Sequence, residues 1–130
     1  MSEDARDRAE VDRFILEYID SVPHLEALLL LWQQNSEPWT VEDIAKRLWI
    51  EPEDARGILQ DLEREHFLTL VAGEAEQYRY RTEPNTDRLL QALSDAYREE
   101  MIRISRMIHA KPSAAVRAFA RAFRFRKEQE

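Results

Sequence analysis

Residues Thr40 to Arg81, TVEDIAKRLWIEPEDARGILQDLEREHFLTLVAGEAEQYRYR, decide the fold of this chain. The Thr40 hydroxyl can accept a hydrogen bond from a free amide at the start of a helix. Asp43 stands at the third helical position, from which its side chain can accept a hydrogen bond from the backbone N–H of Thr40. The apolar stripe of this short helix consists of Ile44, Ala45 and Leu48. The pattern therefore predicts a helix that buries one face.

A second helix start follows at Glu51. Pro52 suits the first helical position, and the acidic Glu53 and Asp54 complement the positive end of the helix. The predicted buried face of this helix, spaced at i, i+3, i+4 and i+7, consists of Ala55, Ile58, Leu59 and Leu62. Two short helices joined by a tight turn indicate a helix-turn-helix.

A β-hairpin is predicted directly after the second helix. Residues 67–71 form a short β-prone run, and Gly73 favours a turn in the segment that follows. Residues 77–81 then alternate, with Tyr78 and Tyr80 on one face and Gln77, Arg79 and Arg81 on the other. A helix-turn-helix followed by a hairpin is a winged helix, so the predicted fold is mostly α with a small β-hairpin.

The segment AKRLWIEPEDARGILQDLEREHFL, Ala45 to Leu68, resembles bacterial winged-helix regulators of the MarR type. Those proteins show a similar run of small, leucine and proline positions before an LxxLExxG(F/L) ending. The resemblance implies that the second helix enters the major groove, that the wing lies over the DNA backbone, and that a terminal helix pairs two chains. The tail KPSAAVRAFARAFRFRK, Lys111 to Lys127, resembles one in uncharacterised bacterial proteins of the same layout.

The residues before this segment are expected to complete a winged-helix domain over residues 11–84. Residues 1–10 are charged and poor in large apolar groups, which predicts a flexible N-terminus. A first helix is expected from near Val11, with the apolar stripe Val11, Phe14, Ile15 and Tyr18. A central helix up to Gln34 is apolar on more than one face, and Trp39 is expected to add a third short strand to the hairpin.

Residues 85–130 are expected to form an interaction region. Thr86 can cap a long helix in which apolar residues recur at three- and four-residue steps over about five turns. This stripe predicts a homodimer that pairs through Leu90, Leu93, Tyr97, Met101, Ile104 and Ile108, in the manner of a two-chain coiled coil. A last, basic helix is expected from about Ser113 to Arg126.

Length and composition narrow the class of protein. A chain of 130 residues with 44% hydrophobic content is enough for one domain with a single core. The absence of cysteine excludes disulfides and cysteine-ligated zinc. The apolar run from Ala27 to Trp32 is far shorter than the roughly 20 residues that cross a bilayer, and no signal peptide is evident. We therefore expect a cytoplasmic protein.

The net charge of −7 is unevenly distributed. Residues 1–84 hold 20 acidic and 9 basic residues, whereas residues 85–130 hold 6 acidic and 10 basic ones. Such asymmetry indicates an interaction surface. The basic tail could bind nucleic acid, a membrane surface or a protein such as the acidic half of a second copy, and its alternative role is a solvated arginine face that covers the dimer.

The outward face of the second helix carries the predicted DNA-binding residues. Arginine can bond guanine and glutamine can bond adenine, so Arg56, Gln60 and Arg64 form a suitable row for contacts with bases. The residues expected to contact the DNA backbone are Thr40, Lys46 and Arg47, and those that serve the wing are Arg79 and Arg81.

The charge of the same helix supports a different interpretation. Residues 52–65 include five acidic and two basic residues, whereas most affinity for DNA normally comes from neutralising phosphates. Arg56 and Arg64 are equally consistent with solvated side chains that pair with neighbouring acids. The alternative function is therefore a protein-interaction adaptor, in which the acidic helix docks a basic partner or the basic tail an acidic one.

No enzyme, cofactor or metal motif is present. His24, His66 and His109 lie on separate predicted elements without HxxxH spacing, two glycines cannot form a phosphate loop, and GxSxG is absent. The predicted fold also serves small-ligand sensors. Trp32, Trp39 and Trp49 could line a pocket between the domain and the dimer surface, although three core tryptophans are the simpler interpretation.

Overall fold

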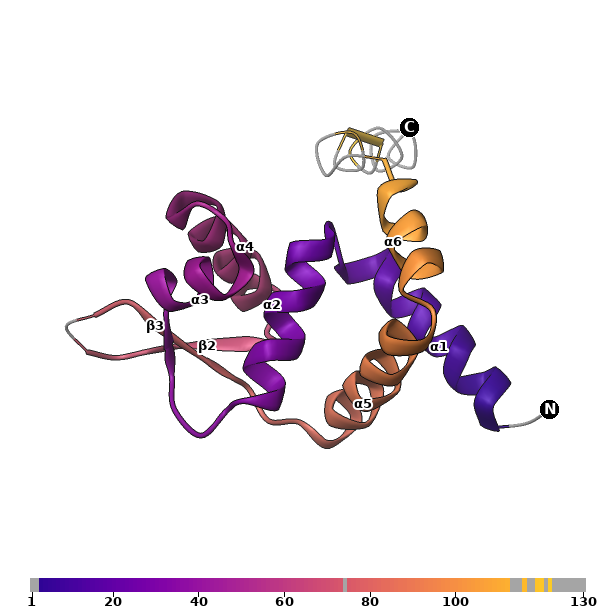
Figure 1. The fold of residues 1–130 in the computed structure, drawn as a ribbon, viewed down its shortest axis with the longest axis horizontal. Helices are drawn as coiled ribbons and strands as arrows, with labels where there is room; N and C mark the ends of the chain where they lie inside the picture. The colour runs from indigo at the N-terminus through magenta and orange to yellow at the C-terminus, as the bar shows by residue number, and fades with distance from the viewer. Residues whose placement is uncertain (1–2, 74, 113–115, 117–118, 121, 123–130) are drawn as a thin grey trace.

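The computed structural model of the protein describes residues 3–73, 75–112, 116, 119–120 and 122. The elements, in chain order, are α1 (Glu3–Tyr18), α2 (Val22–Gln33), β1 (Trp39–Thr40), α3 (Val41–Leu48), α4 (Pro52–Arg64), β2 (Leu68–Val71), β3 (Gln77–Tyr80), α5 (Pro84–Glu99) and α6 (Met101–His109). The helix-turn-helix and the hairpin lie on one side of α2, and α1, α5 and α6 lie on the other (Figure 1). This mostly helical architecture with a small sheet confirms the predicted fold class.

The strands of the described chain form an antiparallel sheet in the order β1-β3-β2. Tyr78 of β3 lies opposite Leu70 of β2 on one side and Trp39 of β1 on the other. Tyr78 and Tyr80 are buried while Arg79 between them is exposed, because successive side chains of a strand point to opposite faces. The predicted wing and the third strand at Trp39 are both confirmed.

Local sequence signals position the helix-turn-helix. Thr40 Oγ1 accepts a hydrogen bond from the backbone N–H of Asp43 at 3.1 Å, which confirms the predicted cap of α3. α4 begins at Pro52, and all four residues of its predicted apolar face are buried. α3 and α4 pack directly against each other. The second helix therefore buries the predicted side and leaves the opposite side for other contacts.

α2 is the helix on which the other elements pack. Ser21 caps its start, because the Ser21 Oγ accepts a hydrogen bond from the backbone N–H of His24 at 3.2 Å. α2 contacts α3, α4, β3 and α5. Its buried residues are Leu25, Ala27, Leu28, Leu29 and Leu31. The prediction of a central helix that is covered from several sides is confirmed.

Two helix starts differ from the sequence-based expectation. α1 begins at Glu3, so the predicted start near Val11 is wrong; Glu10 in the added part pairs with Arg88 of α5 at 2.8 Å. α5 is capped by Glu83 rather than Thr86, because the Glu83 carboxylate accepts from the backbone N–H of Thr86 at 2.9 Å. In both cases a neighbouring charged side chain stabilises helix that apolar periodicity alone did not predict.

The single long helix predicted after the wing is interrupted at Glu100. Four residues of its predicted pairing stripe, Leu90, Leu93, Ile104 and Ile108, are buried in the chain's own core. α5 and α6 both pack against α1, which covers this side of the two helices. The expectation of one uninterrupted outward stripe is therefore wrong, and of its six residues only Met101 is exposed.

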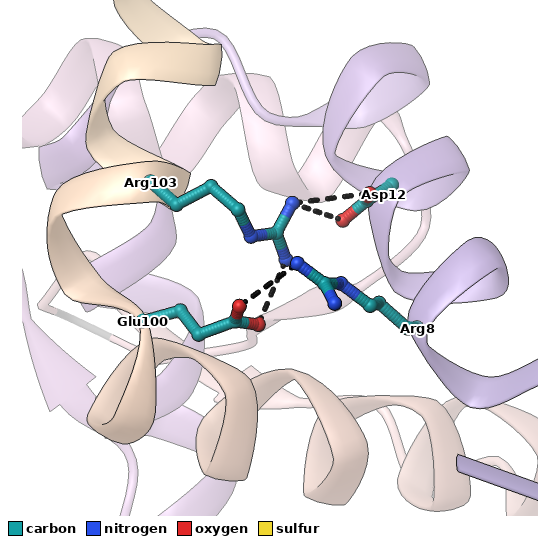
Figure 2. Close-up of polar contacts among 4 residues, drawn as sticks. All are labelled: Arg8, Asp12, Glu100 and Arg103. Atoms are coloured by element: carbon teal, nitrogen blue, oxygen red, sulfur yellow. Dashed lines mark hydrogen bonds and ion pairs between the residues drawn. The ribbon is translucent and has the colours of Figure 1, made fainter. Parts of the chain in front are cut away.

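Charged residues join α1 to the break between α5 and α6. The Arg103 guanidinium donates to both carboxylate oxygens of Asp12, at 3.2 and 3.1 Å, and to Glu100 at 3.1 Å (Figure 2). Arg8 donates to the other oxygen of Glu100 at 2.9 Å. The hydrogen bond from Arg103 holds the pKa of Glu100 below its usual range. No proline or glycine stands at the break, so these ion pairs supply the contacts that favour it.

Lys111 closes the other end of α1. Its ammonium group donates to the backbone carbonyl oxygens of Ile15, at 2.8 Å, and of Ile19. A positive charge suits this place because the end of a helix leaves carbonyl groups unpaired. Most of the basic helix predicted beyond Lys111 lies outside the described residues. Two of its residues that are described, Val116 and Phe119, are helical and exposed. No helix among the described residues is long and apolar enough to cross a bilayer.

The Glu100 ion pairs predict how stability depends on pH. The folded-state pKa of Glu100 is lowered, so its contribution is present above the ordinary range of a glutamate and is lost as pH falls through the folded-state pKa. We expect Glu100→Gln to be less stable than the wild type at pH 7, and equally stable only once the pH has fallen below the lowered folded-state pKa of Glu100. Urea unfolding across this range measures the difference. The control Glu99→Gln should have the stability of the wild type at every pH. A difference in stability between Glu100→Gln and the wild type that does not change with pH would contradict the role given to the Glu100 ion pairs.

Candidate nucleic-acid interface

α4 lies on the same side of α2 as the wing (Figure 1). Its exposed residues are polar apart from Pro52. Its buried side rests on α2 and α3. The outward side carries the predicted row of Arg56, Gln60 and Arg64, of which Gln60 and Arg64 are exposed and Arg56 is half-buried. The structure therefore brings these three residues to one side of a helix that is rigidly held on the opposite side.

Arg56 is held between α4 and the loop that joins the two wing strands. Its Nη1 donates to Glu53 at 2.7 Å and its Nε donates to Glu76 at 3.1 Å. Glu76 also accepts a hydrogen bond from the Tyr78 hydroxyl at 2.7 Å, and this bond, followed by the one from Arg56, lowers the pKa of Glu76. Burial, together with Glu76, raises the pKa of Tyr78 to about 12. The phenol thus remains a donor at neutral pH, and Glu76 remains a charged anchor for Arg56.

Arg64 is freer than Arg56. Its side chain is 71% exposed and makes an i,i+3 ion pair with Asp61 at 3.2 Å. The other oxygen of Asp61 lies 2.8 Å from Nε2 of His24. An exposed pair of this kind contributes only about 0–1 kcal/mol, so Arg64 can exchange Asp61 for another anionic or polar partner.

The predicted backbone contacts on and before α3 lie in different environments. The Thr40 oxygen is engaged as the cap of α3, which leaves its hydroxyl hydrogen free to donate. Lys46 and Arg47 are exposed near the end of α3. Arg47 also lies over the Trp39 ring, 5.5 Å from its centroid, in a cation–π contact. Lys46 is therefore the cation of this group most available to a phosphate.

The wing carries two exposed cations. Arg79 lies in β3 opposite Thr69, and Arg81 follows the strand, where its backbone N–H donates to Phe67 at 2.9 Å. Both arginine side chains are exposed, and they alternate with the buried Tyr78 and Tyr80. The predicted alternation is confirmed, with the two tyrosines buried and Arg79 and Arg81 exposed.

Two of the three tryptophans, Trp32 and Trp39, pack against the core as expected, and Trp49 does not. Trp49 is 93% exposed, and Trp32 and Trp39 are half-buried. A cleft of about 550 Å³ lies between α2, α3 and α5, where Leu29, Leu48 and Tyr97 contribute to its walls, and none of the tryptophans lines it. The expectation of a core position is wrong for Trp49, because it lies in the tight turn after α3 and its side chain is exposed.

No pattern in the sequence indicated the acid that anchors Arg56. Glu76 is 20 positions from Arg56 and lies beyond the first wing strand, so no helical or strand period relates the two residues. The contact of His24 with Asp61 spans 37 positions and is equally hidden. Only the abundance of acidic residues indicated that the arginines of α4 would find partners.

The fold is the MarR-like winged helix, as the resemblance in the middle of the sequence implied. No protein-family model and no curated protein sequence matches the chain. A MepR–DNA complex from Staphylococcus aureus matches with a TM-score of 0.57 at 14% identity, over 97% of this chain and 94% of that one. A MarR family protein from Bacillus stearothermophilus matches with a TM-score of 0.50 at 13% identity, over 96% and 85%. The heme sensor protein PefR from Streptococcus agalactiae, in complex with heme, matches with a TM-score of 0.52 at 14% identity, over 96% of this chain and 86% of that one.

Trp49 provides a test of the turn that sets the position of α4. It adopts the left-handed conformation, with φ 58° and ψ 44°, which favours glycine. We expect Trp49→Gly to raise the free energy of unfolding by about 0.5–1 kcal/mol, because strain is relieved and the exposed ring loses little packing. Trp49→Ala retains the strain and should give no gain. Urea unfolding compares the two variants, and equal effects would show that the turn is not strained.

Proposed function

We propose that the protein is a DNA-binding transcriptional regulator that inserts α4 into the major groove and lays the wing over the DNA backbone. The observation that supports this function is the outward row of Arg56, Gln60 and Arg64, flanked by Arg79 and Arg81 on the wing. A protein of the same fold, MepR, has been solved in complex with DNA. At 14% identity, the likeness to MepR concerns the fold alone. The proposal therefore depends on the residues of α4.

The ion pairs on α4 are weak enough to be exchanged for contacts with bases. The pairs of Arg56 with Glu53 and of Arg64 with Asp61 are surface i,i+3 pairs, which contribute little to stability. The half-buried pair of Arg56 with Glu76 is the contact that Arg56 must give up to reach a base. A bidentate contact between arginine and guanine is worth about 1–3 kcal/mol of discrimination. The freed carboxylates remain near phosphates, so affinity depends on exposed cations such as Lys46, Arg79 and Arg81 and falls steeply with salt.

The acidic residues of the same surface favour a second candidate, a protein-interaction adaptor that does not bind DNA. The exposed Trp49 lies with Ile50 and Pro52 beside a cleft of about 490 Å³ whose rim carries Glu42 and Glu51. An apolar surface edged by carboxylates suits a basic protein segment that also brings apolar side chains. The two candidates make opposite predictions for duplex DNA.

A mobility-shift titration on random-sequence duplex at low salt tests the proposed function. We expect the wild type to bind and the double variant Arg56→Ala/Arg64→Ala to bind about tenfold more weakly, a loss of about 1.4 kcal/mol. Glu76→Gln should strengthen binding, because it removes the charge that anchors Arg56 to the wing.

The matched control is Arg13→Ala, which removes an exposed arginine from α1, away from α4 and the wing. It should bind duplex like the wild type. If the double variant also binds like the wild type, Arg56 and Arg64 do not contact DNA. If the wild type ignores duplex at low salt and retains a basic protein partner, the adaptor is the better assignment.

We also propose that the chain forms a homodimer, with Met101 and Ile102 at the start of α6 in the interface. These are large apolar side chains that the chain itself leaves 53% and 70% exposed. Exposed apolar side chains that lie next to each other mark an interaction surface more often than a single one does. The buried part of the predicted pairing stripe then stabilises each chain, and these exposed neighbours serve the pairing.

Light scattering of purified protein tests the dimer. We expect the wild type to have the mass of two chains and Ile102→Glu to have the mass of one, because a carboxylate in an apolar interface loses its hydration. Leu70→Glu is the matched control on the wing, where an equally large side chain is half exposed, and it should remain dimeric. A monomeric wild type, or a dimeric Ile102→Glu, would remove the assignment.

A further inference from the structure

Three side chains that can bind a metal ion meet where the start of α2 packs against α4. They are Asp20 in the connection between α1 and α2, His24 on α2 and Asp61 on α4, and one ligand atom from each lies within 4.8 Å of the others. Asp20 and His24 have no part in the proposed DNA contacts. No sequence motif marks this cluster, because Asp61 follows His24 by 37 positions and comes from another element.

The His24 ring is oriented as a metal-binding imidazole is. Its Nδ1 lies 2.6 Å from the Ser21 hydroxyl oxygen, and its Nε2 points to Asp61. Ligating histidines usually engage their second ring nitrogen in a hydrogen bond of this kind, which fixes the tautomer and the plane of the ring. The His24 side chain is only 12% exposed, so its position is also fixed by packing.

The positions of Ser21 and Asp61 allow three protonation forms of the His24 ring. In one, the Ser21 hydroxyl donates to Nδ1, and the Nε2–H donates to Asp61 at 2.8 Å; in the imidazolium, both ring nitrogens donate. In the third, the Nδ1–H donates to Ser21, and the lone pair of Nε2 faces the Asp61 carboxylate. A cation between Nε2 and the carboxylates stabilises this third form, because a lone pair and a negative charge otherwise repel each other.

The distances suit a first-row divalent ion. Ligand atoms of a tetrahedral zinc site lie about 2.0–2.2 Å from the ion and therefore roughly 3.4 Å from one another. The present separations, from 2.8 Å for His24 to Asp61 up to a limit of 4.8 Å, bracket that value. Side-chain movements of about one ångström are therefore enough to close the site.

A cleft gives an ion access to the cluster. Its volume is about 410 Å³, and His24 and Asp61 line it together with Glu53, Asp54 and Gly57. Asp54 adds a carboxylate to this lining, which favours cations, whereas Glu53 is already paired with Arg56 at 2.7 Å. A side chain at Gly57 would find open space, with nothing within 4 Å of its Cβ, so this wall does not obstruct entry.

We propose that Asp20, His24 and Asp61 bind one divalent transition-metal ion, such as Zn²⁺, through two carboxylates and the Nε2 of the imidazole, with water in the remaining position. Nitrogen and oxygen ligands without sulfur suit Zn²⁺, Co²⁺ or Mn²⁺. The bound imidazole carries its single proton on Nδ1, where it donates to Ser21: a ring that starts as the neutral Nε2–H tautomer moves that proton to Nδ1 by exchange with solvent, and a ring that starts as the imidazolium releases its Nε2 proton to solvent. The ion joins the start of α2 to α4, and it holds the same carboxylate that pairs with Arg64.

Titration of chelator-treated protein with ZnCl₂ tests the site directly. We expect one equivalent to bind by calorimetry and, at saturating metal, a rise in melting temperature of about 5 °C or more. Asp20→Asn, His24→Gln and Asp61→Asn should each weaken binding by at least the roughly 10- to 100-fold that loss of an outer-shell partner costs. Asp20→Asn is the decisive variant, because Asp20 lies outside the helices and its change leaves the bond between His24 and Asp61 in place.

Two control variants retain the ligands. Asp54→Asn removes a carboxylate from the cleft mouth, and His66→Gln/His109→Gln removes the exposed histidines elsewhere on the chain. Both should bind Zn²⁺ with the wild-type stoichiometry and within about tenfold of its affinity. Absence of binding to the wild type, unchanged binding to Asp20→Asn, or loss of binding in the histidine control would overturn the proposal. Each result stands whether or not the protein binds DNA.

Discussion

Burial of α2 is the constraint on which the rest of the structure depends. Its leucines occupy more than one side of the helix, and water must be excluded from all of them. The helix-turn-helix and β3 cover one side, and α5 contributes to another. Each fully buried leucine contributes about 1.5–3 kcal/mol relative to an exposed one, so neither group of elements is complete without α2 between them. The outward position of α4 is a consequence of this packing.

Charge pairing then decides what the outward surface can do. Arg56 and Arg64 have the chemistry for contacts with bases, yet each meets a carboxylate of its own chain. Such pairs cost little to open, but they reduce the attraction of α4 for phosphates. Specific contacts are therefore better supported than strong non-specific attraction. The acidic residues that weaken attraction for DNA include Asp61, which also completes the cluster with His24 and Asp20.

The interruption between α5 and α6 shows how an apolar stripe can be misjudged. Leu90, Leu93, Ile104 and Ile108 follow a period that suits pairing with a second chain, and the chain buries them itself. The reason is α1, whose apolar side needs a cover and whose Asp12 holds Arg103 beyond the break. Periodicity specifies which face of a helix avoids water, whereas the partner that covers the face is chosen by the whole fold.

The sequence by itself determined the winged helix, because its signals are local: Thr40 as a cap, Pro52 at a helix start, and alternation of Tyr78 and Tyr80 with exposed arginines. It also determined which residues of α4 face outward, since one helical period relates them. Tertiary structure alone decided that Glu76 anchors Arg56, that α1 covers the long apolar stripe, and that Asp61 meets His24. These contacts join residues far apart in the chain, and no local period encodes the separation of such pairs.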